Sequence, residues 1–400
     1  MALGDISATE LIGQKRELYI AIFTGISDVG AGLVASLILI FVKGLPWILS
    51  ILPPLLTIRG VLSGILSGVL TTSLHIGMIK DGFRGNTDDY YGLISAIFLA
   101  SFLQSFLIAI ILGASHASFS VFIDILLVVN ACFFIATAFS VFLTSNVAFL
   151  AFRRGVDPDV VVYPIMSTVN DILINLFVLA TIILLNPLNR GQFILRGSLL
   201  FVFIAIFNLM LVVKNRHTTF FKKVLRESNF GLIYALILSS IAGILLDKMT
   251  PVLKMYPALL IAWPAMLTTV GDAGSITSSI LTTKLHIGEL KPELMDTFFV
   301  YGTVMMRVIL PPFTLALVIY LFISDLLTFT FSTDSIVFLF TVVPLSAYIS
   351  FLMIQILSVA VAIISYEKGL DPDNVSIPIV TSSSDCISTL ILFIIINMLY

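Results

Sequence analysis

Residues 53–77 read PPLLTIRGVLSGILSGVLTTSLHIG, and residues 264–288 read PAMLTTVGDAGSITSSILTTKLHIG. Both stretches begin with proline and end in Leu-His-Ile-Gly, at an offset of 211 positions. A second pair follows, GVDPDVVVYPIMSTVND at 155–171 and GLDPDNVSIPIVTSSSD at 369–385, at an offset of 214. Two matched blocks in the same order and at nearly the same offset indicate that the chain is an internal duplication.

The composition indicates a protein that faces lipid. Of the 400 residues, 59% are hydrophobic and 11% are charged, and the mean hydropathy is +1.12. A soluble domain carries about 25% charged residues, so a soluble multidomain enzyme is excluded. The net charge of −2 leaves no basic footprint for a nucleic-acid partner. Cys132 and Cys386 lie in apolar runs and predict neither a disulfide framework nor a Cys-rich metal site.

Apolar runs of 17 or more residues mark the predicted membrane spans. The polar residues 1–18 lack the pattern of a cleaved signal peptide, so the first run is predicted to be a resident helix. The fold class is therefore an all-α polytopic membrane protein with about eleven transmembrane helices. They lie near 19–42, 48–79, 90–113, 119–150, 161–186, 194–213, 229–247, 255–285, 296–324, 335–365 and 375–399.

The run 194–213 has no match in the other half. Five crossings per half is an odd number, so one additional crossing is needed to make the two five-helix repeats parallel. We predict a first repeat at 1–190, a linker transmembrane helix and cytoplasmic loop at 191–227, and a second repeat at 228–400. The alternative is a linker lying flat in the membrane interface, with inverted repeats. The linker is apolar all round, which favours a crossing.

The distribution of Lys and Arg predicts the orientation. With eleven spans and the N-terminus inside, fourteen of these residues fall on the cytoplasmic side and five on the other. Positive charge collects on the cytoplasmic side of membrane proteins. We therefore expect a multi-pass protein of the cell membrane, with a cytoplasmic N-terminus and an external C-terminus.

Ionisable side chains within the spans are the candidate functional residues, because charge at membrane depth costs several kcal/mol. Asp171 and Asp385 stand out: each lies seven residues, or about two helical turns, after a proline of the last helix of its half. Parallel repeats would place the two carboxylates around a central axis. Carboxylate, hydroxyl and water oxygens suit a hard cation such as Mg²⁺. The alternative is a pair of Asp–Ser/Thr hydrogen bonds that pack helices.

Small polar residues around these acids complete the predicted cation site. Prolines 53, 54 and 264 predict broken helices whose carbonyls line a wet cavity, although a kink alone is the alternative. Asp272 follows the second break, and its counterpart Val61 is apolar, so this level of the path is asymmetric. The predicted metal-site residues are Asp171, Asp385, Asp272, Asn170, Thr381, Ser384, Thr168 and Thr268.

Other ionisable residues carry weaker signals. Asp28 has no acidic counterpart in the second half, and Arg59 or Arg307 could neutralise it, so an ion pair that holds helices together competes with a transport role. His75 and His286 recur at helix ends and are interpreted as packing groups at the membrane interface.

At these motifs the chain resembles the MgtE family of magnesium channels, and more closely its duplicated relatives among the solute-carrier magnesium transporters. The resemblance rests on Pro264 to Glu289 and on the proline and aspartate of both last helices, and it covers nearly the whole chain. It implies a five-helix pore module that normally dimerises, here fused into a single-chain pseudo-dimer. It also implies that Asp171 and Asp385 coordinate largely hydrated Mg²⁺. The cytosolic magnesium-sensing domains of bacterial MgtE are absent, and Val61 replaces the Asn or Asp of the motif.

The preferred hypothesis is Mg²⁺ transport through a central pore between the halves, with no enzymatic activity. A Na⁺- or H⁺-coupled Mg²⁺ exchanger is the alternative, in which Na⁺ or H⁺ is a second transported ion. An intramembrane aspartyl protease would need one dyad of unequal carboxylates, whereas the acid here is duplicated at symmetric sites. An organic-solute transporter would need a roomy aromatic or Arg-lined site. Mg²⁺, Mn²⁺ and Co²⁺ are not distinguished by sequence.

Overall fold

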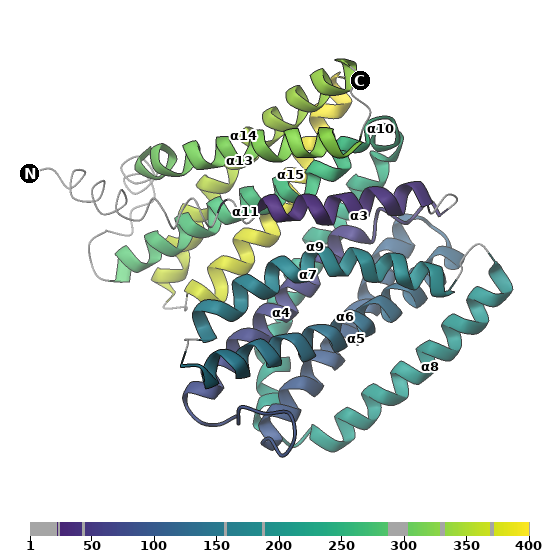
Figure 1. Ribbon diagram of the computed structural model, residues 1–400, viewed down its shortest axis with the longest axis vertical. Helices are drawn as coiled ribbons and strands as arrows, with labels where there is room; N and C mark the ends of the chain where they lie inside the picture. Colours follow the sequence, from purple (N-terminus) through teal and green to yellow (C-terminus); the bar gives the residue numbers. More distant parts are fainter. Residues whose placement is uncertain are drawn as a thin grey trace, which may run out of the picture. The chain divides into compact units, whose positions relative to one another are not determined.

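The computed structural model describes residues 22, 25–41, 45–155, 158–185, 189–286, 303–328, 333–368 and 372–399. All regular structure in these residues is helical (Figure 1). The elements are η1 Gly25–Ser27, α3 Asp28–Phe41, α4 Leu52–His75, α5 Asp88–Ser115, α6 Phe119–Arg153, α7 Pro158–Leu185, α8 Arg190–Asn215, α9 Thr219–Lys248, α10 Thr250–Met255, α11 Pro257–His286, α13 Thr303–Thr328, α14 Thr333–Glu367 and α15 Pro372–Leu399.

The helices match the predicted spans. Within the described ranges, nine helices are long and apolar enough to cross a membrane. Two shorter apolar segments are 25–39, in η1 and α3, and 169–185, in α7. Several begin at conventional caps: the side chains of Thr87, Ser118 and Asn189 accept hydrogen bonds from the first backbone N–H groups of α5, α6 and α8. The chain is an all-α polytopic membrane protein.

The predicted helix breaks at the prolines are wrong. Pro53 and Pro54 stand in the first turn of α4, where a missing N–H costs nothing because it would have no helical partner. Pro264 lies inside α11, which nevertheless continues from Pro257 to His286. Side chains, and not exposed carbonyls of broken helices, therefore carry the polar chemistry of these segments.

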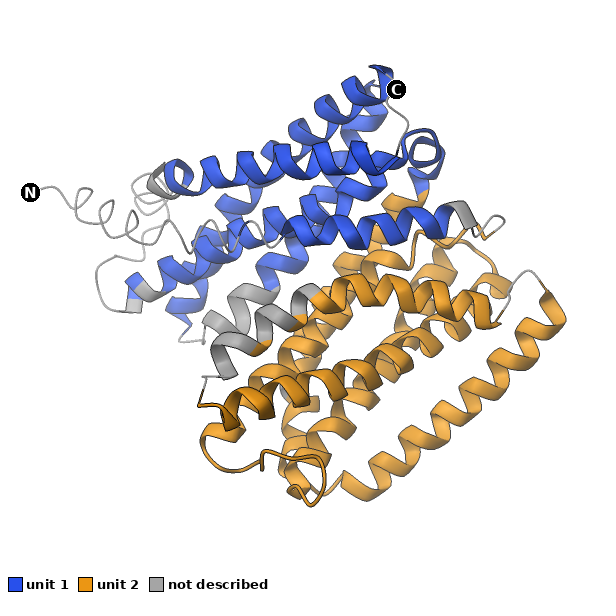
Figure 2. Cartoon of the chain, viewed as in Figure 1, with its two compact units in different colours: residues 1–41, 248–400 blue, residues 42–247 orange. Residues whose placement is uncertain are grey.

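The chain packs as two compact units, residues 1–41 with 248–400 (unit 1) and residues 42–247 (unit 2) (Figure 2). In unit 1, α11 packs against α3, α13, α14 and α15. In unit 2, α4 packs against α5, α6 and α7, and α8 lies against α5 and α6. The predicted boundaries near residues 190 and 228 divide the chain by sequence repeat and not by packing, and they remain a prediction.

The first helix of each predicted repeat packs in the unit that holds the rest of the other repeat. A Cβ atom added at Gly32 of α3 would overlap the carbonyl oxygen of Ile261 in α11. A Cβ added at Gly243 of α9 would overlap the carbonyl oxygen of Ser50, just before α4. Both glycines and both partners are 211 positions apart, so the contact itself is duplicated. Glycine permits this close backbone approach between membrane helices.

The linker helix α8 lies along α5 in the opposite direction. At one end the Asn215 side chain donates a hydrogen bond to Ser95 Oγ, 2.8 Å away. Further along, the rings of Phe201 and Phe106 meet edge to face at 5.6 Å. Within the described residues α8 is long and apolar enough to cross a membrane, and the predicted crossing of the linker stays a prediction.

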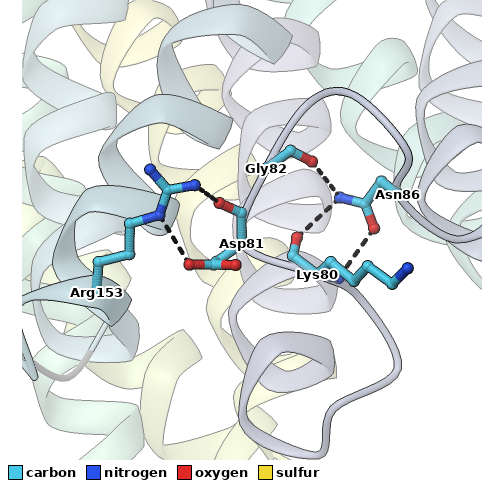
Figure 3. A network of polar contacts seen from close by, with 5 residues as sticks. All are labelled: Lys80, Asp81, Gly82, Asn86 and Arg153. Atoms are coloured by element: carbon cyan, nitrogen blue, oxygen red, sulfur yellow. Dashed lines mark hydrogen bonds and ion pairs between the residues drawn. The ribbon is translucent and has the colours of Figure 1, made fainter.

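The loop between α4 and α5 is held by one asparagine and one ion pair (Figure 3). The Asn86 amide donates to the carbonyls of Lys80 and Gly82, and its oxygen accepts from the Lys80 N–H. Arg153, the last residue of α6, donates through Nε to Asp81 Oδ2 at 2.7 Å. This hydrogen bond holds the pKa of the Asp81 carboxyl below its usual range.

We predict that the Asp81 contact protects this loop only while the carboxyl is charged. Its contribution is fully present above the ordinary pKa of about 3.9 and is lost as the pH falls through the lower pKa of the folded state. Asp81→Asn should therefore speed pepsin cleavage of the loop about two- to fivefold at pH 5. The ratio of the variant cleavage rate to the native cleavage rate should approach one near pH 2. Asn86→Ala removes bonds that do not titrate, so its ratio should stay above one throughout. A constant ratio for Asp81→Asn would contradict the assignment.

Candidate cation site

Asp171 and Asp385 occupy the same place in equivalent helices. Helices α7 and α15 are each 28 residues long, and each aspartate is the fourteenth residue of its helix. At 1.5 Å per residue, both carboxylates lie about 20 Å from either helix end. A charge at that depth is costly unless it is partnered or serves a pathway.

In unit 2, two neighbouring residues of α7 reach across to α4. The Asn170 amide donates a hydrogen bond to Ser63 Oγ at 3.1 Å, and both residues are buried. Asp171 Oδ1 lies 3.7 Å from the Arg59 NH1 atom. The side chain of Arg59 is 4% exposed and that of Asp171 is 22% exposed, so the carboxylate has an open side and the guanidinium is enclosed.

The polar face of α4 explains why these residues meet α7. Arg59, Ser63, Ser67 and Thr71 recur every fourth residue, which places them along one side of the helix, and all four are buried. Ser67 and Thr71 donate to carbonyls of their own helix. Arg59 and Ser63 are the members of this face that face Asp171 and Asn170 of α7.

In unit 1, α15 packs against α11 through polar contacts of the same kind. Ser384 Oγ donates to the Leu267 carbonyl at 3.4 Å. Trp263 Nε1 donates to Thr389 Oγ1, which donates to the Asp385 carbonyl. A Cβ on Gly271 would lie 2.9 Å from Ser384 Oγ, so glycine allows the two helices to approach closely here.

The predicted site residues fall into these two groups. Asn170 and Asp171 lie together on α7, Ser384 contacts α11, and the remaining members Thr268, Asp272, Thr381 and Asp385 are partly buried on α11 and α15. The side chain of Thr168 is outside the described part of the structure. Arg59 lies 3.7 Å from Asp171, and its predicted pairing with Asp28 stays a prediction.

Two polar residues escaped the sequence reading because they carry no charge. Ser63 accepts the hydrogen bond of Asn170. Gln355 of α14 accepts from Thr277 Oγ1 at 2.6 Å and donates to the Ala273 carbonyl at 3.2 Å. An amide inside the apolar run FLMIQILSVA, and the four-residue spacing on α4, were the available signals. A search for amides within apolar runs would have found Gln355, and the four-residue spacing would have found Ser63.

The described residues contain no cluster of Cys or carboxylate side chains of the kind that forms protein metal-binding sites. No group of three or more His, Cys, Asp or Glu side chains there is arranged to hold a metal ion. Cys132 and Cys386 are buried free thiols. The assignment of Asp171 and Asp385 to a cation site stays a prediction from the sequence.

The family model of the MgtE divalent cation transporters matches residues 52–182 and 263–395. The chain belongs to the MgtE family. The two matched segments contain Asp171 and Asp385, all of α4 and most of α7, α11 and α15, and they stand one in each predicted repeat. The duplicated MgtE organisation predicted from the motifs is confirmed.

Curated relatives agree with this assignment. The chain is 24% identical over 371 residues to solute carrier family 41 member 3 of Mus musculus, covering 86% of this chain and 74% of the relative. The protein of the same name from Rattus norvegicus is also 24% identical, with 86% and 78% covered. No solved structure matches the chain. Membership of the MgtE family makes this chain a transporter of divalent cations and not an enzyme, so the aspartyl-protease alternative is wrong.

Proposed function

We propose that this MgtE chain carries Mg²⁺ across the cell membrane along a central path between its pseudo-symmetric halves, as a single-chain pseudo-dimer. Asp171 and Asp385 coordinate the ion, which keeps most of its water shell. Two carboxylates cannot supply six ligands, and Mg²⁺ gives up its waters reluctantly. The N-terminus faces the cytoplasm and the C-terminus the outside.

One observation carries the proposal: the same acid stands at the middle of the last helix in both matched segments. Packing between helices does not need a carboxylate twice, and a buried charge is expensive. The neighbours are oxygen donors in both copies, with Asn170 and Ser63 in one and Ser384 in the other. Oxygen ligands of this kind select hard cations.

The remaining members of the predicted site accept hydrogen bonds from the waters of the ion. Thr381 and Ser384 lie within one turn of Asp385, and Asn170 directly precedes Asp171. The predicted member Thr168 has its side chain outside the described part of the structure. Thr268 and Asp272 line the path from α11. Asp272 has the apolar counterpart Val61, so the path is asymmetric at that level.

A membrane potential alone can drive the proposed uptake. A doubly charged ion gains about 4.6 kcal/mol per 100 mV of inside-negative potential. Coupling to Na⁺ or H⁺ is therefore not required, and the chain acts as a channel. The alternative is a Na⁺- or H⁺-coupled exchanger, and the experiment below distinguishes the exchanger from the channel.

The test is Mg²⁺ entry into proteoliposomes that contain a Mg²⁺-sensitive dye. We expect entry to follow the imposed K⁺-diffusion potential, and to be unchanged when outward Na⁺ or H⁺ gradients are added. Entry that requires one of these gradients would replace the channel by an exchanger. Entry equal to that of protein-free liposomes, for Mn²⁺ and Co²⁺ as well, would refute divalent-cation transport along this path.

A further inference from the structure

The Arg59–Asp171 pair places a fixed positive charge beside one of the two proposed ligands. The duplication does not repeat this arginine, because Val270 stands 211 positions after Arg59 and is fully buried. An arginine at this position of the repeat is thus found in the first copy only. This difference is a property of the chain that the duplication by itself does not predict.

The geometry of the pair leaves the carboxylate available to an ion. The 3.7 Å between Arg59 NH1 and Asp171 Oδ1 is longer than the 2.7–2.9 Å of a charge-assisted hydrogen bond. Asp171 is 22% exposed, whereas Arg59 is 4% exposed. A cation can therefore approach the open side of the carboxylate while the guanidinium stays behind it.

The register of α7 against α4 is fixed next to this pair. Asn170 precedes Asp171, and its hydrogen bond to Ser63 joins the two helices one turn along α4 from Arg59. This bond holds the backbone of α7 at Asp171 next to the turn of α4 that carries Arg59. The positive charge is built into the helix pair.

We propose that Arg59 sets the affinity of the cation site, by holding a positive charge behind Asp171 that weakens divalent binding. This inference rests on the proposed role of Asp171 and Asp385. A path conducts only when ions bind well enough to enter and weakly enough to leave. A carboxylate with no positive charge behind it would hold a doubly charged ion too long, and Arg59 shortens the stay of the ion at Asp171.

The experiment compares Arg59→Gln with the native chain in full-length protein. Gln keeps most of the side-chain length and removes the charge. We expect the Mg²⁺ concentration for half-maximal flux to fall by about tenfold or more, since one like charge near the ion is gone, and the maximal flux to fall because release is slower. Arg59→Lys keeps the charge and should restore the native half-saturation. Arg307→Gln, on an exposed position of α13, removes a membrane-segment arginine elsewhere and should leave half-saturation unchanged.

A binding readout separates this role from helix packing. The thermal midpoint of purified Arg59→Gln should rise more on addition of Mg²⁺ than that of the native protein. An ion pair that only holds helices together would lower the midpoint equally with and without Mg²⁺, and would leave half-saturation unchanged. That outcome overturns the inference. Arg59→Val, which copies Val270, is the second variant if Arg59→Gln does not fold.

Failure of the proposed function has a different signature. If Asp171→Asn, with Arg59 in place, changes neither flux nor the Mg²⁺-induced shift of the midpoint, then Asp171 is not a ligand and the proposed site fails. If Asp171→Asn reduces both while Arg59→Gln changes neither, the site stands and only the role of Arg59 is refuted.

Discussion

The Asp171→Asn, Asp385→Asn double variant will reduce Mg²⁺ flux to the level of protein-free liposomes. Asn keeps the shape of the side chain and removes the charge that attracts the ion, so both electrostatic contacts to the hydrated cation are lost. Each single variant should lower flux by about tenfold or more. Dye-reported entry at a fixed membrane potential is the measurement, and native-like flux in the double variant would refute the ligand assignment.

The two single variants should differ in stability, and this difference makes the flux result interpretable. Asp171→Asn removes the carboxylate that faces the buried Arg59 guanidinium, so we expect a loss of about 3 kcal/mol in the free energy of unfolding. Asp385→Asn should cost less than half of that, since Val270 stands where the first copy has Arg59. Adding Arg59→Gln to Asp171→Asn should recover stability but not flux. Asp272→Asn, which introduces a residue of the family motif, should be milder in both measurements.

The second large effect is expected where the first helix of each predicted repeat packs against helices of the other repeat. Gly32→Ala and Gly243→Ala should each lower the free energy of unfolding by about 2–3 kcal/mol, because the new Cβ overlaps a backbone carbonyl that cannot rotate away. The measurement is thermal unfolding in detergent for each variant. The two losses should be similar, since the contacts are duplicates of one another.

A matched control separates overlap from the change of residue itself. A Cβ at Gly68 of α4 meets nothing within 4 Å, so Gly68→Ala should be neutral or stabilise its helix by up to about 1 kcal/mol. If Gly32→Ala and Gly243→Ala behave like Gly68→Ala, the close approach of α3 to α11 and of α9 to the start of α4 is not present in the protein.

The spans and the duplication were predictable because both are properties of local sequence. Apolar runs long enough to cross a membrane read directly as helices, and the matched blocks align without knowledge of packing. The prolines misled the prediction because composition does not show whether Pro53 falls in a first turn, where it is tolerated, or in a helix interior. Hydrogen-bond register decides that, and register depends on where the helix begins.

The contact of Arg59 with Asp171 could not be read from the chain. Asp28, Asp171 and Asp385 are all acids within spans, and the sequence gives no distance between them and Arg59. The four-residue spacing of Arg59, Ser63, Ser67 and Thr71 does predict one polar face of α4, but not which helix covers it. Likewise, nothing in the repeat indicates that α3 packs with α11. The sequence of α3 would be the same whether this helix packed with its own repeat or with the other one.

The exchange of first helices also determines the order in which the protein can assemble while it is being made. Unit 2 is one continuous segment, residues 42–247, so all of its helices are available once α9 has left the ribosome. Helix α3 is synthesised before any of them, yet its contact at Ile261 lies 229 residues after Gly32. At about 5–20 residues per second, α3 waits in the bilayer for roughly 10–45 s with its glycine face uncovered. During translation this early helix depends on lipid, or on the insertion machinery, to shield the surface that α11 later covers.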